Sequence, residues 1–251
     1  MLRALHRLPL LRHVPSLGRA EIWILVSLAV SAALVLGFVG IADEVLEGET
    51  QDIDMAVLQA LRAADGTPLG PGWINEAMRD LTALGSFSVL GLMVIAVLGY
   101  LLLTGKRVMA LLVLVSVIGG TLVSSVLKEL FSRPRPSLEH AAEVFTASFP
   151  SGHALISTVT YLTLGALLAR VQASARLRVY IIGIAVLLAL VIGLSRLYLG
   201  VHYPTDVLAG WCLGAAWAGL CLAVAAWLQR RGTAEQPGPE ATGRGARVAD
   251  A

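Results

Sequence analysis

Charged residues are scarce in this chain. Asp, Glu, Lys and Arg make up 14% of its 251 residues, whereas hydrophobic residues make up 57%. A soluble globular domain normally carries about 25% charged residues, so the composition excludes an ordinary soluble protein and predicts an integral membrane protein. The formal net charge of +2 is too small to suggest a nucleic-acid-binding protein.

Cysteine is also rare. The two cysteines, Cys212 and Cys221, lie in one apolar run. The two cysteines are nine residues apart. On a helix nine residues span about 13 Å, whereas a disulfide requires Cα atoms within about 7 Å of each other. A disulfide between them is therefore excluded, and the cysteine content does not indicate a cellular compartment.

The amino-terminal region combines basic residues with a long apolar run. Residues 1–20 contain Arg3, Arg7, Arg12 and Arg19 and no acid, and residues 22–41 carry no charge. A signal peptide is the alternative interpretation. The run is about twice the usual length of a signal-peptide core and no clear cleavage site follows it, which favours a retained first transmembrane helix.

Further apolar runs predict an all-α integral membrane protein with six transmembrane helices. The five runs after the first are residues 85–104, 108–127, 150–169, 179–194 and 207–228. Between the first two runs, residues 43–80 are rich in Asp and Glu. Met55, Leu58 and Leu61 recur there at helical spacing, which predicts a short helix on the membrane surface or against the bundle. We expect this segment to be scaffold without chemistry.

Basic residues fall in alternate connections. They lie in residues 105–107, in residues 170–178 and at Arg230 and Arg231. The positive-inside rule then places both termini in the cytoplasm and the acidic first loop outside. The predicted organisation is a basic cytoplasmic segment at 1–20, a membrane domain at 21–229 and a disordered cytoplasmic tail at 230–251.

A cluster of reactive side chains follows the fifth apolar run. Arg196, His202 and Asp206 stand between two hydrocarbon-rich segments, where polar residues are costly and usually mark a substrate or ion site. Pro204 suits the first turn of a helix, so Asp206 lies four residues past His202 and close enough to orient its imidazole. A cation, an oriented imidazole and a carboxylate are the parts needed for nucleophilic attack on a phosphoryl group.

A second basic segment follows the third apolar run. Pro134 and Pro136 stop the helix after Lys128, so Arg133 and Arg135 stand in an extended segment that can fold back toward the lysine. Basic side chains that merely reach the membrane boundary are the alternative interpretation.

The third polar segment lies at the beginning of the fourth apolar run. Ser151 can cap that helix, and Gly152 leaves its first backbone amides uncovered, which is typical of an anion site. Taken alone, His153 would more often be a structural histidine. Ser151 is not predicted to be a nucleophile, because the Gly-x-Ser-x-Gly elbow is absent.

Together the three segments resemble the tripartite signature of the type-2 phosphatidic acid phosphatase superfamily of membrane lipid phosphatases. Its first two patterns are Lys-x6-Arg-Pro, met by Lys128, Arg135 and Pro136, and Pro-Ser-Gly-His, met by residues 150–153. The third is Ser-Arg-x5-His-x3-Asp, met by Ser195, Arg196, His202 and Asp206. The resemblance spans residues 81–228, and three motifs in order between membrane spans are highly specific.

The resemblance implies a role for each matching residue. His202 would attack phosphorus and become a phosphohistidine, Asp206 would hold its tautomer, and His153 would protonate the leaving oxygen. The remaining matching residues would bind the phosphoryl oxygens and steady the developing charge: Lys128, Arg135, Arg196, Ser151 and Gly152. Arg133 stands at the wrong distance from Lys128 for the pattern and is interpreted as a neighbour of the site. No metal or other cofactor is expected, since Asp206 is the only carboxylate among the residues that match the fixed positions of the signature.

The predicted function is hydrolysis of a lipid phosphate or diphosphate at an outward-facing site. An isoprenoid diphosphate such as the undecaprenyl carrier is the leading candidate, and phosphatidate and phosphatidylglycerophosphate are also considered. A phosphotransferase of the same superfamily is one alternative, and a polytopic anion or lipid transporter is another. The expected partners are the lipid substrate and the bilayer, and the oligomeric state stays open.

Overall fold

The computed structural model describes residues 18–138 and 146–230. Within these ranges the chain forms eight α-helices and no strand. They are α1 (Arg19–Glu47), α2 (Gln51–Ala60), α3 (Gly72–Ala83), α4 (Phe87–Leu103), α5 (Arg107–Phe131), α6 (Gly152–Arg170), α7 (Ala175–Tyr198) and α8 (Pro204–Arg230). The predicted amino-terminal segment and carboxy-terminal tail lie almost wholly outside the described residues.

Five of these helices are long and apolar enough to cross a membrane: α1, α5, α6, α7 and α8. The remaining predicted span, residues 85–104, corresponds to α4, which pairs with α3 across a bend of 43°. The prediction of an all-α, multi-span membrane protein is confirmed. The bend was not anticipated, because residues 81–86 show no proline to mark it.

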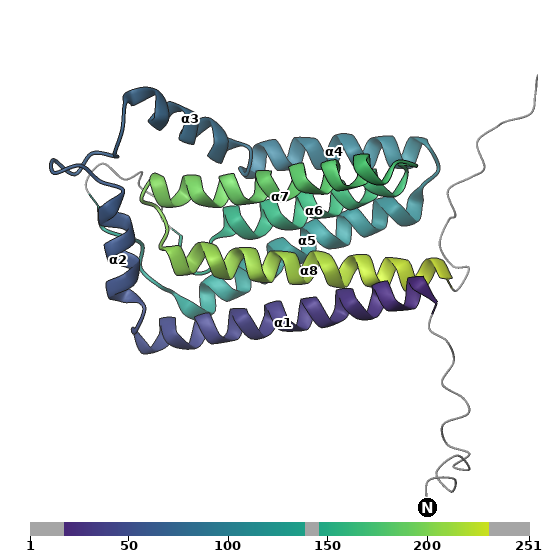
Figure 1. Cartoon of the computed structure of the whole chain (residues 1–251), viewed down its shortest axis with the longest axis horizontal. Helices are drawn as coiled ribbons and strands as arrows, with labels where there is room; N and C mark the ends of the chain where they lie inside the picture. The colour runs from purple at the N-terminus through teal and green to yellow at the C-terminus, as the bar shows by residue number, and fades with distance from the viewer. Residues whose placement is uncertain (1–17, 139–145, 231–251) are drawn as a thin grey trace, which may run out of the picture.

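The long helices lie side by side along the long axis of the molecule, while α2 lies across one end and α3 extends beyond that same end (Figure 1). Helix α1 packs along α8, and α6 packs against both α7 and α8. Most of α1 faces outward, with apolar side chains such as Trp23 and Leu36 exposed. Such a surface is suited to lipid rather than to water.

Small residues bring α6 and α8 into close contact. A Cβ added to Gly210 would lie 2.8 Å from the carbonyl oxygen of Ser151, and one added to Gly214 would lie 2.6 Å from that of Leu155. Only glycine fits at these two positions, and a Gly-x3-Gly pair of this kind is a common way for membrane helices to approach. The beginnings of α6 and α8, which carry two of the three polar segments, are thereby held together.

The short helix predicted within residues 43–80 is present as α2, with Leu58 fully buried against the bundle. An unanticipated feature is Asp54, whose side chain is also fully buried. A buried carboxylate needs partners to offset the loss of hydration, and these partners belong to the polar segments described below.

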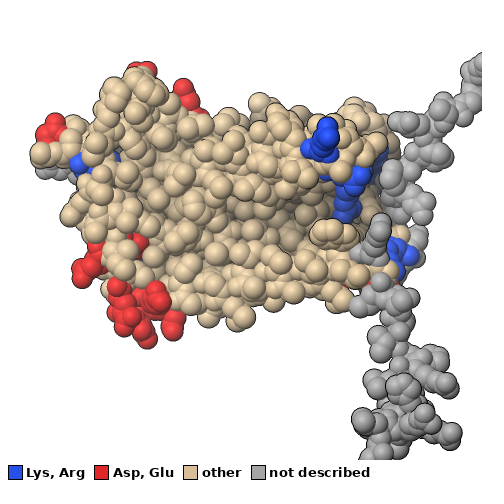
Figure 2. Space-filling model, viewed as in Figure 1, with Lys and Arg blue, Asp and Glu red and all other residues tan. Residues whose placement is uncertain are grey.

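Charge is segregated along the bundle (Figure 2). Asp and Glu side chains gather around the end that carries α2 and α3, and the Lys and Arg side chains in this view lie mainly at the other end. That second end carries the α4–α5 connection, the α6–α7 connection and the end of α8.

Candidate active site

The three polar segments meet at the end of the bundle that carries α2. They are the last turn of α5 with residues 132–138, residues 146–151 with the first turn of α6, and the connection from α7 to α8. The sequence separates these segments widely, and helix packing brings them into hydrogen-bonding contact. The backbone N–H of Ser151, for example, donates to the carbonyl oxygen of Asp206 at 2.9 Å.

His202 lies at the centre of the site and is 1% exposed. Its Nδ1 is 3.4 Å from Asp206 Oδ2, and its Nε2 is 3.2 Å from Arg135 Nη1. Because a guanidinium only donates, these partners assign the proton to Nδ1 and the lone pair to Nε2. The unprotonated nitrogen therefore faces the cationic side of the site.

Burial lowers the pKa of His202 to about 4, although the neighbouring Asp206 carboxylate acts in the opposite direction. The imidazole is therefore neutral near pH 7 and keeps the lone pair that a nucleophile requires.

Asp206 is fully buried and every oxygen of its carboxylate has a partner. Oδ2 accepts hydrogen bonds from Ser148 Oγ and from the backbone N–H of Tyr203, and Oδ1 pairs with Arg133 Nη1 at 2.7 Å. The Tyr203 contact also satisfies a free N–H at the beginning of α8. The carboxylate is thus fixed in both position and orientation behind His202.

Arg135 is held between two segments. Its Nε and Nη2 donate to the carbonyl oxygen and hydroxyl of Thr146 at 2.7 and 3.0 Å, and its Nη1 donates to the carbonyl oxygen of Val201 at 2.6 Å. The extended segment after α5 therefore folds back as the two prolines predict, and Nη1 lies next to the free nitrogen of His202.

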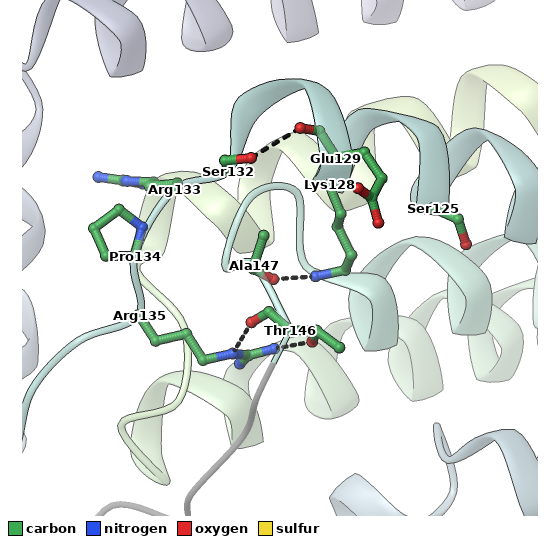
Figure 3. A pocket seen from close by; sticks show the side chains of 9 residues that line it. All are labelled: Ser125, Lys128, Glu129, Ser132, Arg133, Pro134, Arg135, Thr146 and Ala147. Atoms are coloured by element: carbon green, nitrogen blue, oxygen red, sulfur yellow. Dashed lines mark hydrogen bonds between the residues drawn. The ribbon is translucent and has the colours of Figure 1, made fainter.

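Lys128 points toward the same region (Figure 3). Its Nζ donates to the carbonyl oxygen of Ala147, and a Cβ on Gly152 would lie 3.5 Å from its Cε. A cavity of about 610 Å³ opens here. Its lining residues are Ser125, Lys128, Glu129, Ser132, Arg133, Pro134, Arg135, Thr146 and Ala147.

Arg196 reaches the site from the last turn of α7 and is 8% exposed. Its Nη1 donates to Thr82 Oγ1 at 3.0 Å, at the bend between α3 and α4. Among the described residues its Nε has no hydrogen-bond partner. A buried guanidinium nitrogen without a partner is suited to an incoming anion.

His153 and Ser151 begin α6. Ser151 Oγ accepts from the backbone N–H of Ala154 at 3.5 Å, which is the predicted cap. The imidazole of His153 interacts electrostatically with Arg196, His202, Arg135 and Lys128. A Cβ on Gly85 would lie 3.4 Å from His153 Cδ2, so the bend between α3 and α4 packs directly on this histidine.

Arg133 contacts the site more closely than its interpretation as a neighbour suggested. It pairs with Asp206 at 2.7 Å and with Asp54 of α2 at 2.8 Å. The expectation that the acid-rich segment is only scaffold therefore leaves out Asp54. The sequence pattern could have predicted that Asp54 is buried, because it shares the helical face of Leu58 and Leu61 at spacings of four and seven residues.

Other contributors carry no sequence signal. Ser148, Thr82 and Thr205 are ordinary polar residues that gain their roles from tertiary contacts. Within the described ranges, no group of three or more His, Cys, Asp or Glu side chains is arranged to hold a metal ion. The expectation of metal-free chemistry stays a prediction.

The chain is similar in sequence to known proteins. The sequence profile of the PAP2 superfamily matches residues 109–230. Phosphatidylglycerophosphatase B of Bacillus subtilis (strain 168) is 32% identical over 186 residues, covering 72% of this chain and 88% of the relative. Undecaprenyl-diphosphatase of Sulfolobus acidocaldarius is 41% identical over 68 residues, which cover 27% of this chain and 29% of that protein.

A solved structure is also similar. The crystal structure described as the first transmembrane PAP2 type phosphatidylglycerolphosphate phosphatase, from Bacillus subtilis, superposes with a TM-score of 0.71 at 29% identity. The match covers 77% of this chain and 94% of the other. The architecture of the bundle is thus shared over almost the whole of that structure.

Proposed function

The chain belongs to the PAP2 superfamily of lipid phosphatases, and we propose that it hydrolyses a lipid phosphate or diphosphate through a phosphohistidine formed at His202. The observation that carries this proposal is the arrangement of the buried imidazole. Its Nδ1 faces Asp206, its neutral Nε2 faces Arg135, and Lys128 and Arg196 approach from two other helices.

In the first step, Nε2 of His202 attacks phosphorus and the bond from phosphorus to the leaving oxygen breaks. Protonated His153 donates its proton to that oxygen. The guanidinium groups of Arg135 and Arg196 and the ammonium of Lys128 offset the charge on the phosphoryl oxygens, and Arg196 Nε gains the partner it otherwise lacks.

In the second step, water attacks phosphorus and the bond to Nε2 breaks. Neutral His153 takes the proton from the water, which restores both histidines and releases phosphate. Asp206 stabilises the Nδ1 proton of His202 in both steps, as a carboxylate does for other nucleophile and base pairs. No step requires a metal ion, so EDTA is expected to leave the rate unchanged.

The substrate we favour is an isoprenoid diphosphate, followed by phosphatidylglycerophosphate and phosphatidate. The site lies at the ends of the spans, level with lipid headgroups, so that a tail can stay in the bilayer while its phosphate reaches Lys128 and Arg135. The cavity of about 610 Å³ beside these two residues offers room for a second phosphoryl group. Recognition then depends on phosphate and tail.

Phosphate release by the purified protein in mixed micelles tests this function. Polyprenyl diphosphate, phosphatidylglycerophosphate and phosphatidate are compared with a short, water-soluble isoprenoid diphosphate. Loss of the tail should lower kcat/KM by orders of magnitude, because remote binding energy no longer assists the reaction. Equal efficiency on the tail-free compound would contradict a lipid substrate. Activity should also be lost in His202→Ala and His153→Ala, which remove the two proposed catalytic histidines. His13→Ala, which changes a histidine in the basic amino-terminal segment, is their matched control.

We further propose that the site faces outward and that the opposite end faces the cytoplasm. The separation of acidic and basic side chains between the two ends of the bundle supports this orientation (Figure 2).

A further inference from the structure

Arg133 links two buried carboxylates that lie far apart in the sequence. Its Nη1 is 2.7 Å from Asp206 Oδ1 and its Nη2 is 2.8 Å from Asp54 Oδ2, and both aspartates are fully buried. The guanidinium also lies 4.2 Å from the centre of the Tyr203 ring. These contacts fix the plane of the guanidinium, because the fork and the aromatic face constrain it together.

Asp54 is also fastened to the first turn of α8. Its Oδ1 accepts from the backbone N–H of Thr205 at 3.0 Å, and its Oδ2 accepts from Thr205 Oγ1 at 2.6 Å. The N–H groups that begin a helix have no partner within it, and carboxylates are favoured there by the helix dipole. A carboxylate from α2 therefore completes the same turn that carries Asp206.

This arrangement needs a reason beyond stability. Buried ion pairs often contribute little net stability, because desolvation of the charges offsets their attraction. Burial acts to lower the pKa of Arg133, but the carboxylates of Asp206 and Asp54 outweigh it, so that the pKa is raised overall. The side chain is therefore a permanent cation placed against the residue that supports the nucleophile.

Arg133 is poorly placed to bind the substrate phosphate itself. In Figure 3 its side chain points away from Lys128 and Arg135, although all three line the same cavity. Both of its terminal nitrogens are already bonded to carboxylates. A direct role in binding phosphate would require breaking two buried ion pairs.

We propose that Arg133 and Asp54 are positioning residues for catalysis. Arg133 fixes Oδ1 of Asp206, so that Oδ2 faces Nδ1 of His202, and Asp54 fixes Arg133 from α2. This inference rests on the proposed function, because it takes His202 as the nucleophile. It makes α2, a helix outside the three signature segments, part of the machinery that aims the imidazole.

Such a role has a distinct kinetic consequence. Misplacing a reacting group by about 1 Å can cost about 100-fold in rate, whereas substrate binding changes little when no ligand of the substrate is removed. Loss of either positioning residue should therefore lower kcat and spare KM. Loss of a phosphate ligand such as Arg135 should change KM as well.

The test compares Arg133→Gln, Arg133→Lys and Asp54→Asn with Asp52→Asn, a matched control. Asp52 lies in the same helix, is exposed and undergoes the same chemical change. For each monodisperse protein in detergent, kcat, KM and the thermal midpoint are measured with one lipid substrate. We expect Arg133→Gln and Asp54→Asn to lower kcat by about 10- to 100-fold with KM within about twofold. Arg133→Lys should recover part of kcat, and Asp52→Asn should match the wild type.

The double variant Asp54→Asn with Arg133→Gln sharpens the result. Because the two side chains act through one contact, it should be no slower than the worse single variant. A raised KM with unchanged kcat would make Arg133 a substrate ligand and overturn the inference. Wild-type kinetics, or a lower thermal midpoint with unchanged kcat, would overturn it too.

If Arg133→Gln gives no folded protein, Arg133→Lys and Asp54→Asn carry the same test. If His202→Ala keeps its activity, the proposed function itself fails. If His202→Ala is inactive while the Arg133 and Asp54 variants behave as wild type, only the positioning role fails.

Discussion

Both ends of the bundle carry Lys and Arg, but they hold them differently. At one end Lys128, Arg133, Arg135 and Arg196 are partly or fully buried and bonded to carbonyl groups, hydroxyls or carboxylates. At the other end residues such as Arg107, Arg176 and Arg178 are exposed. Burial of a cation is costly and exposure is not.

The two groups of cations are therefore expected to have different roles, one in catalysis and one in membrane orientation. We propose that the buried cations around the neutral imidazole receive an anion, and that the exposed cations at the ends of the spans set the orientation through the positive-inside rule. Charges at the first end should therefore be sensitive to substitution, and charges at the second end should tolerate it.

His153→Ala should lower turnover by about 10²- to 10⁴-fold, the usual contribution of a general acid. The loss should be smaller on an aryl phosphate with a good leaving group, because that group departs without a proton. Steady-state rates on a lipid phosphate and on p-nitrophenyl phosphate measure the difference. Equal losses on both substrates would remove the assignment of His153 as the acid.

Arg196→Gln should lower kcat/KM by about 10²- to 10³-fold, as expected when one preorganised donor to a developing charge is lost. Arg176→Gln makes the same chemical change at the other end and should leave kcat/KM within about twofold of the wild type. Phosphate release measured at several substrate concentrations checks both. A strong effect of Arg176→Gln would contradict the division between the two ends.

The depressed pKa of His202 predicts a pH-dependent stability. The unfolded chain binds a proton at this residue near pH 6.5 and the folded protein only near pH 4. Stability from this group is thus fully present above about pH 6.5 and decreases as the pH falls toward 4, by about 3 kcal/mol at most. Thermal midpoints of the wild type and His202→Ala between pH 4 and 8 should converge toward acid. A constant difference would contradict the buried, neutral imidazole.

The smallest change in activity is expected for the cysteine substitutions that report the membrane orientation. In a background without Cys212 and Cys221, Ser137→Cys should react with an impermeant maleimide in intact cells, and Arg176→Cys should react only after lysis. Both positions are exposed in the folded protein. The reverse pattern would invert the proposed topology.

Much of the fold follows from the apolar runs, because each span must satisfy its backbone hydrogen bonds as a helix. The boundaries were less accessible. Helix α1 continues to Glu47, past the uncharged run that ends at residue 41, because acidic side chains at the end of a span can remain in water. At the bend between α3 and α4, Gly85 packs closely against Ile192 and His153. These contacts join distant parts of the chain, so the local sequence does not predict the bend.

The site shows the same division. Lys128, Arg135, His153, Arg196 and His202 could be selected from the sequence, since each matches a fixed position of the three motifs. Ser148 and Thr82 are not accessible in this way, because their importance arises only from contacts made in three dimensions. The Arg133–Asp54 pair joins residues 79 positions apart and depends on how α2 folds back over the bundle.

His202 is proposed to form a covalent bond to phosphorus during turnover. A lipid substrate labelled with ³²P at the reacting phosphoryl group is mixed with the enzyme and quenched in alkali within milliseconds, since phosphohistidine survives base and hydrolyses in acid. We predict that label remains on the protein and maps to the peptide that contains His202. His202→Ala should trap none, and His13→Ala should trap as much as the wild type. Turnover without any labelled protein in a time-resolved quench, or label on a different residue, would contradict the account.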